Sequence, residues 1–328
     1  MMKQGLVWWF LIVLGIAGGC ERKPAEEQAA AGSKTAGEKI QAFVGILPMA
    51  DFVQRIGGQH VEVEVLVGPG KSPHTFAPTP QQMAALERCE AYFSLGLPFE
   101  ERLIAKIAAS MPTLNVVDCR EGLELRMMEA GEAHHHEEGE EHEHEQAETQ
   151  AHKEDHGPTL SAAEMDPHVW LDPKRVKIIA ETICGELCRL DPARRPEYQA
   201  NLLNFVTELN ELDARITNTL APLKGREFFV FHPAFGYFGD SYGLKQVPVE
   251  IEGKDPTPQQ IATLIEKAKK EGVKVIFVQP QFSLHIAQAI AKEIGGAVAP
   301  LDDLPENYIQ SMDEMAKKLA DALGEQTP

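Results

Sequence analysis

Short apolar segments alternate with helical patterns along two stretches of this chain. Short apolar runs bounded by turn residues predict strands, whereas apolar residues three and four positions apart predict helices. The expected strands of the first stretch are residues 40–47, 61–67, 91–96 and 115–119, and those of the second are 227–232, 246–251, 273–279 and 297–301. Helical patterns lie between or after them, at residues 49–57, 79–88, 99–109, 257–271, 283–294 and 306–323.

The two stretches are separated by about fifty residues that are helical in pattern throughout. Apolar residues recur at helical spacing in this connector, at Leu202, Phe205, Val206, Leu209, Leu212 and Ile216. A continuous helix over residues 196–220 would be about 37 Å long. Strand–helix alternation implies mostly parallel sheets. The pattern predicts an α/β fold with two lobes, each a mostly parallel four-stranded sheet flanked by helices, joined by one long rigid helix. The expected boundaries are 40–172 for the N-terminal lobe, 173–224 for the helical connector and 225–328 for the C-terminal lobe.

The first forty residues predict export and membrane attachment. Lys3 precedes an apolar run at residues 5–16, which is too short to cross a bilayer as a stable helix. Small residues directly before Cys20 resemble the bacterial lipobox, in which this cysteine is acylated and becomes the first residue of the mature protein. We expect a lipoprotein signal peptide at residues 1–20 and a flexible tether at 21–39. The alternative is a plain secretory signal with an incidental cysteine.

Composition changes abruptly between residues 133 and 158, where the chain reads AHHHEEGEEHEHEQAETQAHKEDHGP. This segment holds seven of the twelve histidines, namely His134, His135, His136, His142, His144, His152 and His156. Folding it would cost chain entropy with little burial in return, so we expect residues 133–157 to be a disordered loop. Imidazole and carboxylate groups suit zinc and similar divalent metals, which favours a secondary metal-binding loop. The alternative is a solvated acidic run that happens to contain histidine.

The formal net charge of −19 is concentrated in the same region, because residues 132–156 carry ten acidic side chains and one lysine. Nothing in the chain resembles the basic footprint of a nucleic-acid-binding protein. The length of 328 residues fits about two domains. Beyond Cys20, the cysteines are Cys89, Cys119, Cys184 and Cys188, none with CxxC spacing. The last two are four residues apart on one expected helix face, which is poor disulfide geometry.

Three of the five histidines outside the loop share one context. His74, His168 and His232 each lie beside a proline, just after an extended or strand-like segment. Proline makes these positions turns, and loops after the carboxyl ends of strands line the ligand crevice of α/β lobes. Asp302 follows an expected strand in the same way, with Asp303 as the neighbouring alternative. Three imidazoles and a carboxylate between two lobes would form a four-ligand Zn²⁺ site, although each histidine taken singly reads as a hydrogen-bonded turn residue. His60 and His285 lack this context, and we expect them at the surface.

Longer segments surround these histidines: VGPGKSPH at 67–74 with PTP at 78–80, DPHVWLDP at 166–173, HPAFGYF at 232–238, IFVQPQFS at 276–283 and LDDL at 301–304. They are similar to segments of the metal-binding lipoproteins that serve bacterial metal-ion ABC importers (cluster A-I), in their zinc-type form. The resemblance spans about residues 40–325. Two positions depart from the family pattern, since Ser72 and Gln279 stand where aspartate and glutamate are common.

The resemblance implies two lobes linked by one long helix, a buried metal between them and delivery of that metal to a membrane permease. It implies that His74, His168 and His232 are ligands and that Asp302 is a possible fourth, with water or another carboxylate as alternatives. Histidine at position 232 instead of glutamate, together with the histidine-rich loop, favours zinc over manganese on ligand softness.

We therefore predict a monomeric, lipid-anchored protein of the periplasm that captures Zn²⁺ and passes it to an ABC permease without catalysing a reaction. One alternative is a manganese or iron importer component of the same fold. A second is a zinc hydrolase, in which three histidines leave a position open for water, although the chain has no HExxH motif. A third is a storage or adhesion protein that uses the loop alone, which would not need the three proline-flanked histidines.

Overall fold

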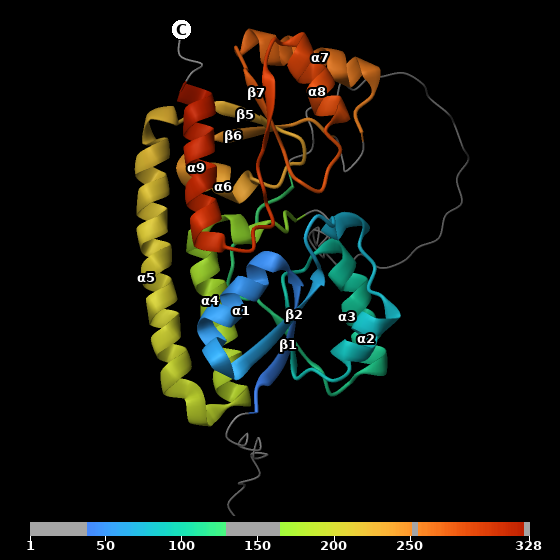
Figure 1. The fold of residues 1–328 in the computed structure, drawn as a ribbon, viewed down its shortest axis with the longest axis vertical. Coiled ribbons are helices and arrows are strands. Elements are labelled where there is room, and N and C mark those ends of the chain that lie inside the picture. The colour runs from blue at the N-terminus through green and yellow to red at the C-terminus, as the bar shows by residue number, and fades with distance from the viewer. Residues whose placement is uncertain (1–37, 129–164, 251–254, 325–328) are drawn as a thin grey trace, which may run out of the picture. The chain divides into compact units, whose positions relative to one another are not determined.

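The computed structural model describes residues 38–128, 165–250 and 255–324 of the chain (Figure 1). The predicted signal peptide, Cys20, most of the predicted tether and all seven histidines of the histidine-rich segment lie outside these residues. No helix in the described ranges is both long and apolar enough to cross a membrane.

The first sheet consists of four parallel strands in the order β2-β1-β3-β4. Its strands are β1 (Ile40–Ile46), β2 (Val61–Val67), β3 (Ala91–Ser94) and β4 (Asn115–Asp118), and its helices are α1 (Leu47–Gly57), α2 (Pro80–Leu86) and α3 (Pro98–Ser110). Prolines at the first turns of these helices cost no hydrogen bond, and Thr79 forms a capping box with Gln82 at the start of α2.

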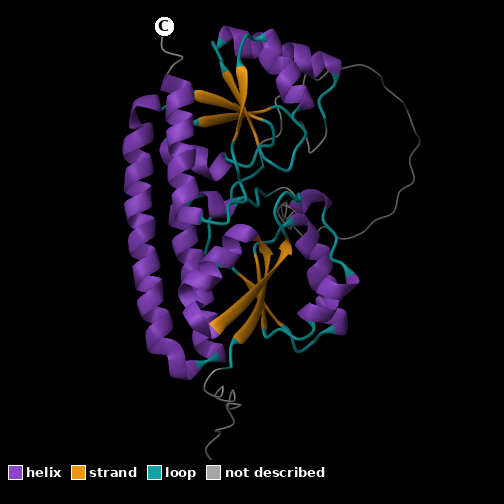
Figure 2. Ribbon diagram, in the orientation of Figure 1, coloured by secondary structure: helices purple, strands orange, loops and turns teal. Residues whose placement is uncertain are grey.

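The second sheet repeats this topology, with parallel strands in the order β6-β5-β7-β8. Its strands are β5 (Glu227–Val230), β6 (Lys245–Pro248), β7 (Val275–Val278) and β8 (Ala297–Pro300), and its helices are α6 (Gly236–Tyr242), α7 (Pro258–Lys270) and α8 (His285–Glu293). The predicted α/β class with two parallel four-stranded sheets is confirmed (Figure 2). Helix α6 was not predicted, because it is short and two of its seven residues are glycines, which disfavour helix.

A long helix, α5 (Arg195–Leu220), follows α4 (Pro173–Leu190) between the two sheets in the sequence. The predicted long helix is thus confirmed, with 26 residues. Helices α1, α4 and α9 (Tyr308–Gly324) pack against it. The buried face of α5 consists of Tyr198, Phe205, Leu209, Leu212, Ile216 and Leu220.

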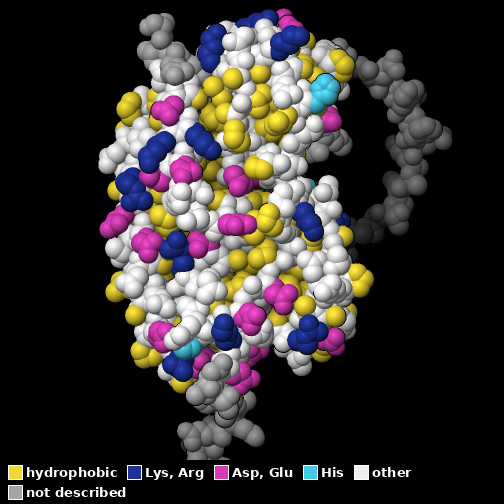
Figure 3. Space-filling model, in the orientation of Figure 1, with side chains coloured by type: hydrophobic (Ala, Val, Ile, Leu, Met, Phe, Trp, Pro, Cys, Tyr) yellow, Lys and Arg dark blue, Asp and Glu magenta, His cyan; other side chains and the backbone are white. Residues whose placement is uncertain are grey.

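Apolar packing joins the elements of both sheets. The larger core runs from the first sheet through α4, α5 and α9 to residues of the second sheet, such as Phe228 in β5 and Phe277 in β7. A smaller core of Phe229, Ile276 and residues of α8 covers the other face of the second sheet. Because one core is continuous across both halves, we expect them to behave as a stiff unit. On the face drawn in Figure 3, acidic and basic side chains are interspersed.

Candidate metal centre

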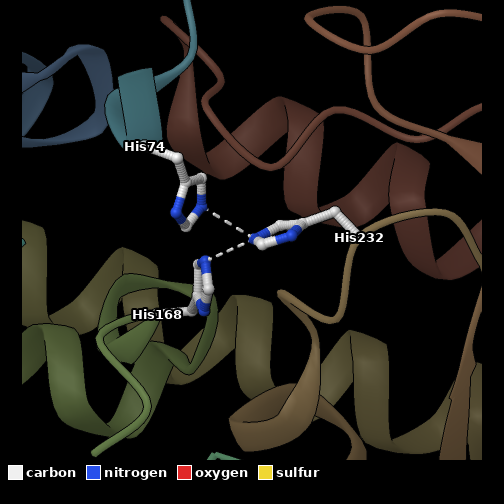
Figure 4. A group of neighbouring side chains, drawn as sticks. All are labelled: His74, His168 and His232. Atoms are coloured by element: carbon white, nitrogen blue, oxygen red, sulfur yellow. Dashed lines mark hydrogen bonds between the residues drawn. The ribbon is translucent and has the colours of Figure 1, made fainter. Parts of the chain in front are cut away.

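Three loops bring histidines together at one point (Figure 4). His74 lies in a 3₁₀ turn, Pro73–Thr75, where its backbone N–H donates to Ser72 Oγ at 3.3 Å. His168 directly precedes the 3₁₀ turn Val169–Leu171. His232 follows β5 and precedes α6. The Pro-flanked turns expected from the sequence therefore direct three imidazoles toward one another.

The spacing of the three rings fits a metal ion. Nε2 of His232 lies 3.0 Å from Nε2 of His74 and 3.2 Å from Nε2 of His168, and all three atoms lie within 4.8 Å of one another. Tetrahedral zinc with Zn–N bonds of about 2.0–2.1 Å places neighbouring ligand nitrogens about 3.3 Å apart. His168 and His232 are buried, whereas His74 keeps an exposed edge. Three nitrogens facing one another in this way suit a central cation, with one tetrahedral position left for a fourth ligand.

Strand register builds the surroundings of His232. Val230 pairs with Pro248 of β6 and with Phe277 of β7, so the residues two places further along each strand also come side by side. Nδ1 of His232 accordingly forms a hydrogen bond with Glu250. Gln279 accepts from the backbone N–H of His232 at 3.2 Å and donates to its carbonyl oxygen at 2.7 Å. Gln279, where the family often has glutamate, thus holds the backbone of His232 through both ends of its amide.

A second carboxylate contacts His168. Asp166 Oδ1 lies 2.8 Å from Nδ1 of His168 and also accepts from the His168 backbone N–H at 3.0 Å. Both side chains are buried. A carboxylate on one ring nitrogen favours the proton there and leaves the other nitrogen free for a metal. Neither Asp166 nor Glu250 was assigned a role from the sequence, although Asp166 stands inside the DPHVWLDP motif.

The electrostatics of the site keep His74 uncharged. Burial, followed by the electrostatic effects of His232 and His168, lowers the pKa of His74 to about 3. The protonated, positively charged form of the His74 ring is disfavoured beside two other imidazoles. The neutral imidazole is the form that binds a metal. This ring is therefore ready to bind a metal at neutral pH without first losing a proton.

The two neighbouring aspartates occupy different environments. Asp302 is exposed, and its Oδ1 accepts from the backbone N–H of Leu304 at 2.9 Å, so the structure does not bring it into the histidine group. Asp303 is buried and accepts from Gln281 Nε2 at 2.5 Å, while its carbonyl oxygen accepts from Trp170 Nε1 at 2.6 Å. Burial raises the pKa of Asp303, and His232 and His168 oppose this rise electrostatically. Asp303, the alternative named from the sequence, is thus the buried member of the aspartate pair, and like Asp302 it lies outside the group formed by the three histidines.

The remaining histidines and cysteines of the described residues lie apart from this group. His285 is exposed, as expected. His60, also expected at the surface, is partly exposed, and its ring lies 3.0 Å from the carboxylate of Glu197 at the start of α5. The four cysteines beyond Cys20 are free thiols, and Sγ of Cys184 lies 3.9 Å from Sγ of Cys188.

Comparisons with known proteins relate the chain to proteins of zinc uptake. A family model described as zinc-uptake complex component A, periplasmic, matches residues 43–322. The chain is 30% identical over 270 residues to the high-affinity zinc uptake system protein ZnuA of Bacillus subtilis, which covers 82% of this chain and 79% of that protein. It is 29% identical over 279 residues to the zinc-binding protein AdcA of Streptococcus pyogenes, covering 83% of this chain but only 52% of AdcA. The chain thus spans about half the length of that relative.

A solved structure of a ZnuA deletion mutant with zinc bound is also similar, with a TM-score of 0.74 and 36% identity over 87% of this chain and 98% of that one. The match to the family model extends over well more than half of the chain. The chain therefore belongs to the family of periplasmic zinc-uptake component A proteins, which are solute-binding proteins of zinc transport and not enzymes.

Proposed function

We propose that this protein captures Zn²⁺ outside the cytoplasm at His74, His168 and His232 and delivers it to an ABC permease in the membrane. The observation that carries this proposal is the convergence of three Nε2 atoms from three separate loops, at 3.0 and 3.2 Å. The zinc-uptake description of the family and the bound zinc in a similar ZnuA structure support zinc as the cargo.

In this proposal the fourth ligand is not Asp302. It is either Asp303 or a water molecule. Asp303 is buried, its side chain accepts a hydrogen bond from Gln281, and His168 and His232 act electrostatically on its carboxyl group. A divalent cation between the histidines would stabilise its charged form. Asp302 already uses Oδ1 for a backbone hydrogen bond and faces solvent.

Zinc is favoured over manganese by the ligand set. Three imidazoles with at most one carboxylate suit zinc, whereas manganese prefers a larger share of oxygen ligands. The relatives described above are named for zinc binding or zinc uptake, which points the same way.

Anchoring through acylated Cys20 and a periplasmic location complete the proposal. The family description includes the word periplasmic, and the lipobox-like residues before Cys20 favour a lipid anchor over simple release. A tethered carrier stays within reach of its permease, which raises the effective concentration of loaded protein at the membrane. We propose that the carrier acts as a monomer.

A zinc competition titration of purified variants tests the site. His168→Ala should bind zinc much more weakly at the tight site. The loss of affinity should exceed the about 10- to 100-fold that is typical of removing an outer-shell partner. His285→Ala is the matched control, because this histidine is exposed and lies apart from the site. An unchanged affinity in His168→Ala would rule out the proposed site.

The same titration distinguishes the two aspartates. Asp303→Ala should weaken zinc binding, and less than His168→Ala, because water can take the place of a carboxylate ligand. Asp302→Ala should bind zinc as the wild type does. The reverse order would return the fourth-ligand assignment to Asp302.

A further inference from the structure

We propose that Asp166 and Glu250 are positioning residues that hold His168 and His232 ready for the metal, and that Arg126, which contacts α6, holds Asp166 in place. This inference rests on the proposed zinc site and assigns the groups that orient two of its ligands. Each carboxylate acts through a histidine ring and not by contact with the metal.

The two carboxylate oxygens of Asp166 contact different residues. Oδ1 accepts from Nδ1 of His168 at 2.8 Å and from the His168 backbone N–H at 3.0 Å, which fixes both the ring and its chain. Oδ2 lies 3.3 Å from Nη1 of Arg126. Because the carboxylate can only accept, the ring proton must sit on Nδ1, and Nε2 presents its lone pair to the other histidines.

Glu250 holds His232 in the same way, from the segment that follows β6. The carboxylate of Glu250 is buried and forms a hydrogen bond with Nδ1 of His232. The backbone N–H of Glu250 donates to the carbonyl oxygen of Phe231 at 3.0 Å. The ring of Phe282 stacks on His232 with the centroids 5.2 Å apart and the planes 23° apart. The His232 ring is therefore held both at its edge and on its face. Within the described part of the chain, no carboxylate contacts Nδ1 of His74, the exposed member of the group.

Arg126 connects Asp166 to α6. Its Nε lies 3.1 Å from Asp240 Oδ2, and its guanidinium lies 5.9 Å from the centre of the Tyr237 ring. The Tyr237 hydroxyl donates to the carbonyl oxygen of Asp166 at 2.9 Å and accepts from the backbone N–H of Arg126 at 3.0 Å. The orientation of His168 thus depends on residues next to the second sheet.

Gly236 makes room for this arrangement. A Cβ atom at this position would lie 1.3 Å from Nη1 of Arg126 and 2.7 Å from Oδ2 of Asp166. Any side chain at position 236 would displace the Arg126 guanidinium and crowd the Asp166 carboxylate, while all the histidines of the chain are kept. Gly236→Ala therefore disturbs the contact between Arg126 and Asp166 without changing a charge.

Zinc competition on purified, full-length variants tests the proposal. Asp166→Ala and Glu250→Ala should each weaken zinc binding by about 10- to 100-fold, the range for removing an outer-shell partner. Asp166→Asn should lose less zinc affinity than Asp166→Ala, because the amide oxygen can still accept a hydrogen bond from Nδ1 of His168. The loss of zinc affinity in Gly236→Ala should lie between the losses in Asp166→Asn and Asp166→Ala. Glu100→Ala is the control for general destabilisation, because this buried carboxyl group contacts Tyr92 in the first sheet.

Histidine ring NMR separates positioning from a merely structural role. In the metal-free wild type, long-range ¹H–¹⁵N spectra should show His168 with its proton on Nδ1. Asp166→Ala should shift this ring toward the other tautomer, and Asp166→Asn should restore it. Affinities within twofold of wild type in both alanine variants, or an unchanged tautomer in Asp166→Ala, would overturn the proposal. Failure of the zinc site itself would look different, because His168→Ala would then also bind zinc normally.

Discussion

Glu100 is a buried carboxyl group whose hydrogen bonds tie β3 to α3. Oε2 accepts from the backbone N–H groups of Leu95 and Leu97, both at 2.9 Å, and Oε1 accepts from the Tyr92 hydroxyl at 2.5 Å. Burial raises the pKa of Glu100, and these hydrogen bonds only partly oppose it. The folded protein therefore keeps a proton on this group at pH values where the unfolded chain, with a carboxyl pKa of about 4.5, has lost it.

The sign of the pH effect follows from this difference in bound protons. The contribution of Glu100 to the free energy of unfolding is complete below about pH 4.5 and declines as the pH rises through the folded-state pKa. Glu100→Gln should remove this decline, because glutamine can accept from both N–H groups and donate to Tyr92 without titrating. Urea unfolding of the metal-free proteins between pH 4 and 8 measures it. Equal pH dependence in wild type and Glu100→Gln would contradict the prediction.

At the scale of elements, α5 contributes one strip of buried apolar side chains. Leu209 is fully buried on this face, whereas Leu203 on the same helix is 67% exposed. Leu209→Ala should lower the free energy of unfolding by about 2–5 kcal/mol, since it removes apolar contacts and leaves a cavity. Leu203→Ala should change it by less than about 0.5 kcal/mol. Urea denaturation of the two variants gives both values, and equal losses would mean that α5 does not pack through this strip.

At the scale of the whole molecule, the histidine-rich segment of residues 133–157 is a separate question from the tight site. It lies outside the described residues, and its sequence predicts no packed structure. Ordering its imidazoles around a metal should cost conformational entropy, so we expect sites there to be several and weaker. Deleting residues 133–157 should reduce total bound zinc and leave one tight site. Elemental analysis after dialysis measures this, and loss of the tight site would show that the segment supplies one of its ligands.

The sequence by itself determined the elements and the histidines. Apolar periodicity and turn residues are local features, and they were enough for the eight strands, the long helix and the α/β class. Proline beside His74, His168 and His232 marked turns at the ends of extended segments, which is also a local signal. Helix α6 was missed because it contains two glycines and lacks the start signal that the Thr79-Pro80 pair gives to the equally short α2.

Only the tertiary structure decided which groups surround the histidines. Glu250 lies 18 residues from His232 in the chain and reaches it because β5 and β6 pair in register. Asp302 and Asp303 are chemically identical neighbours, so no local pattern distinguishes them. Packing beside Trp170 and Gln281 buries one and leaves the other in solvent. Burial and long-range pairing depend on the whole fold, and therefore the partners and protonation of the site became visible only when both sheets were in place.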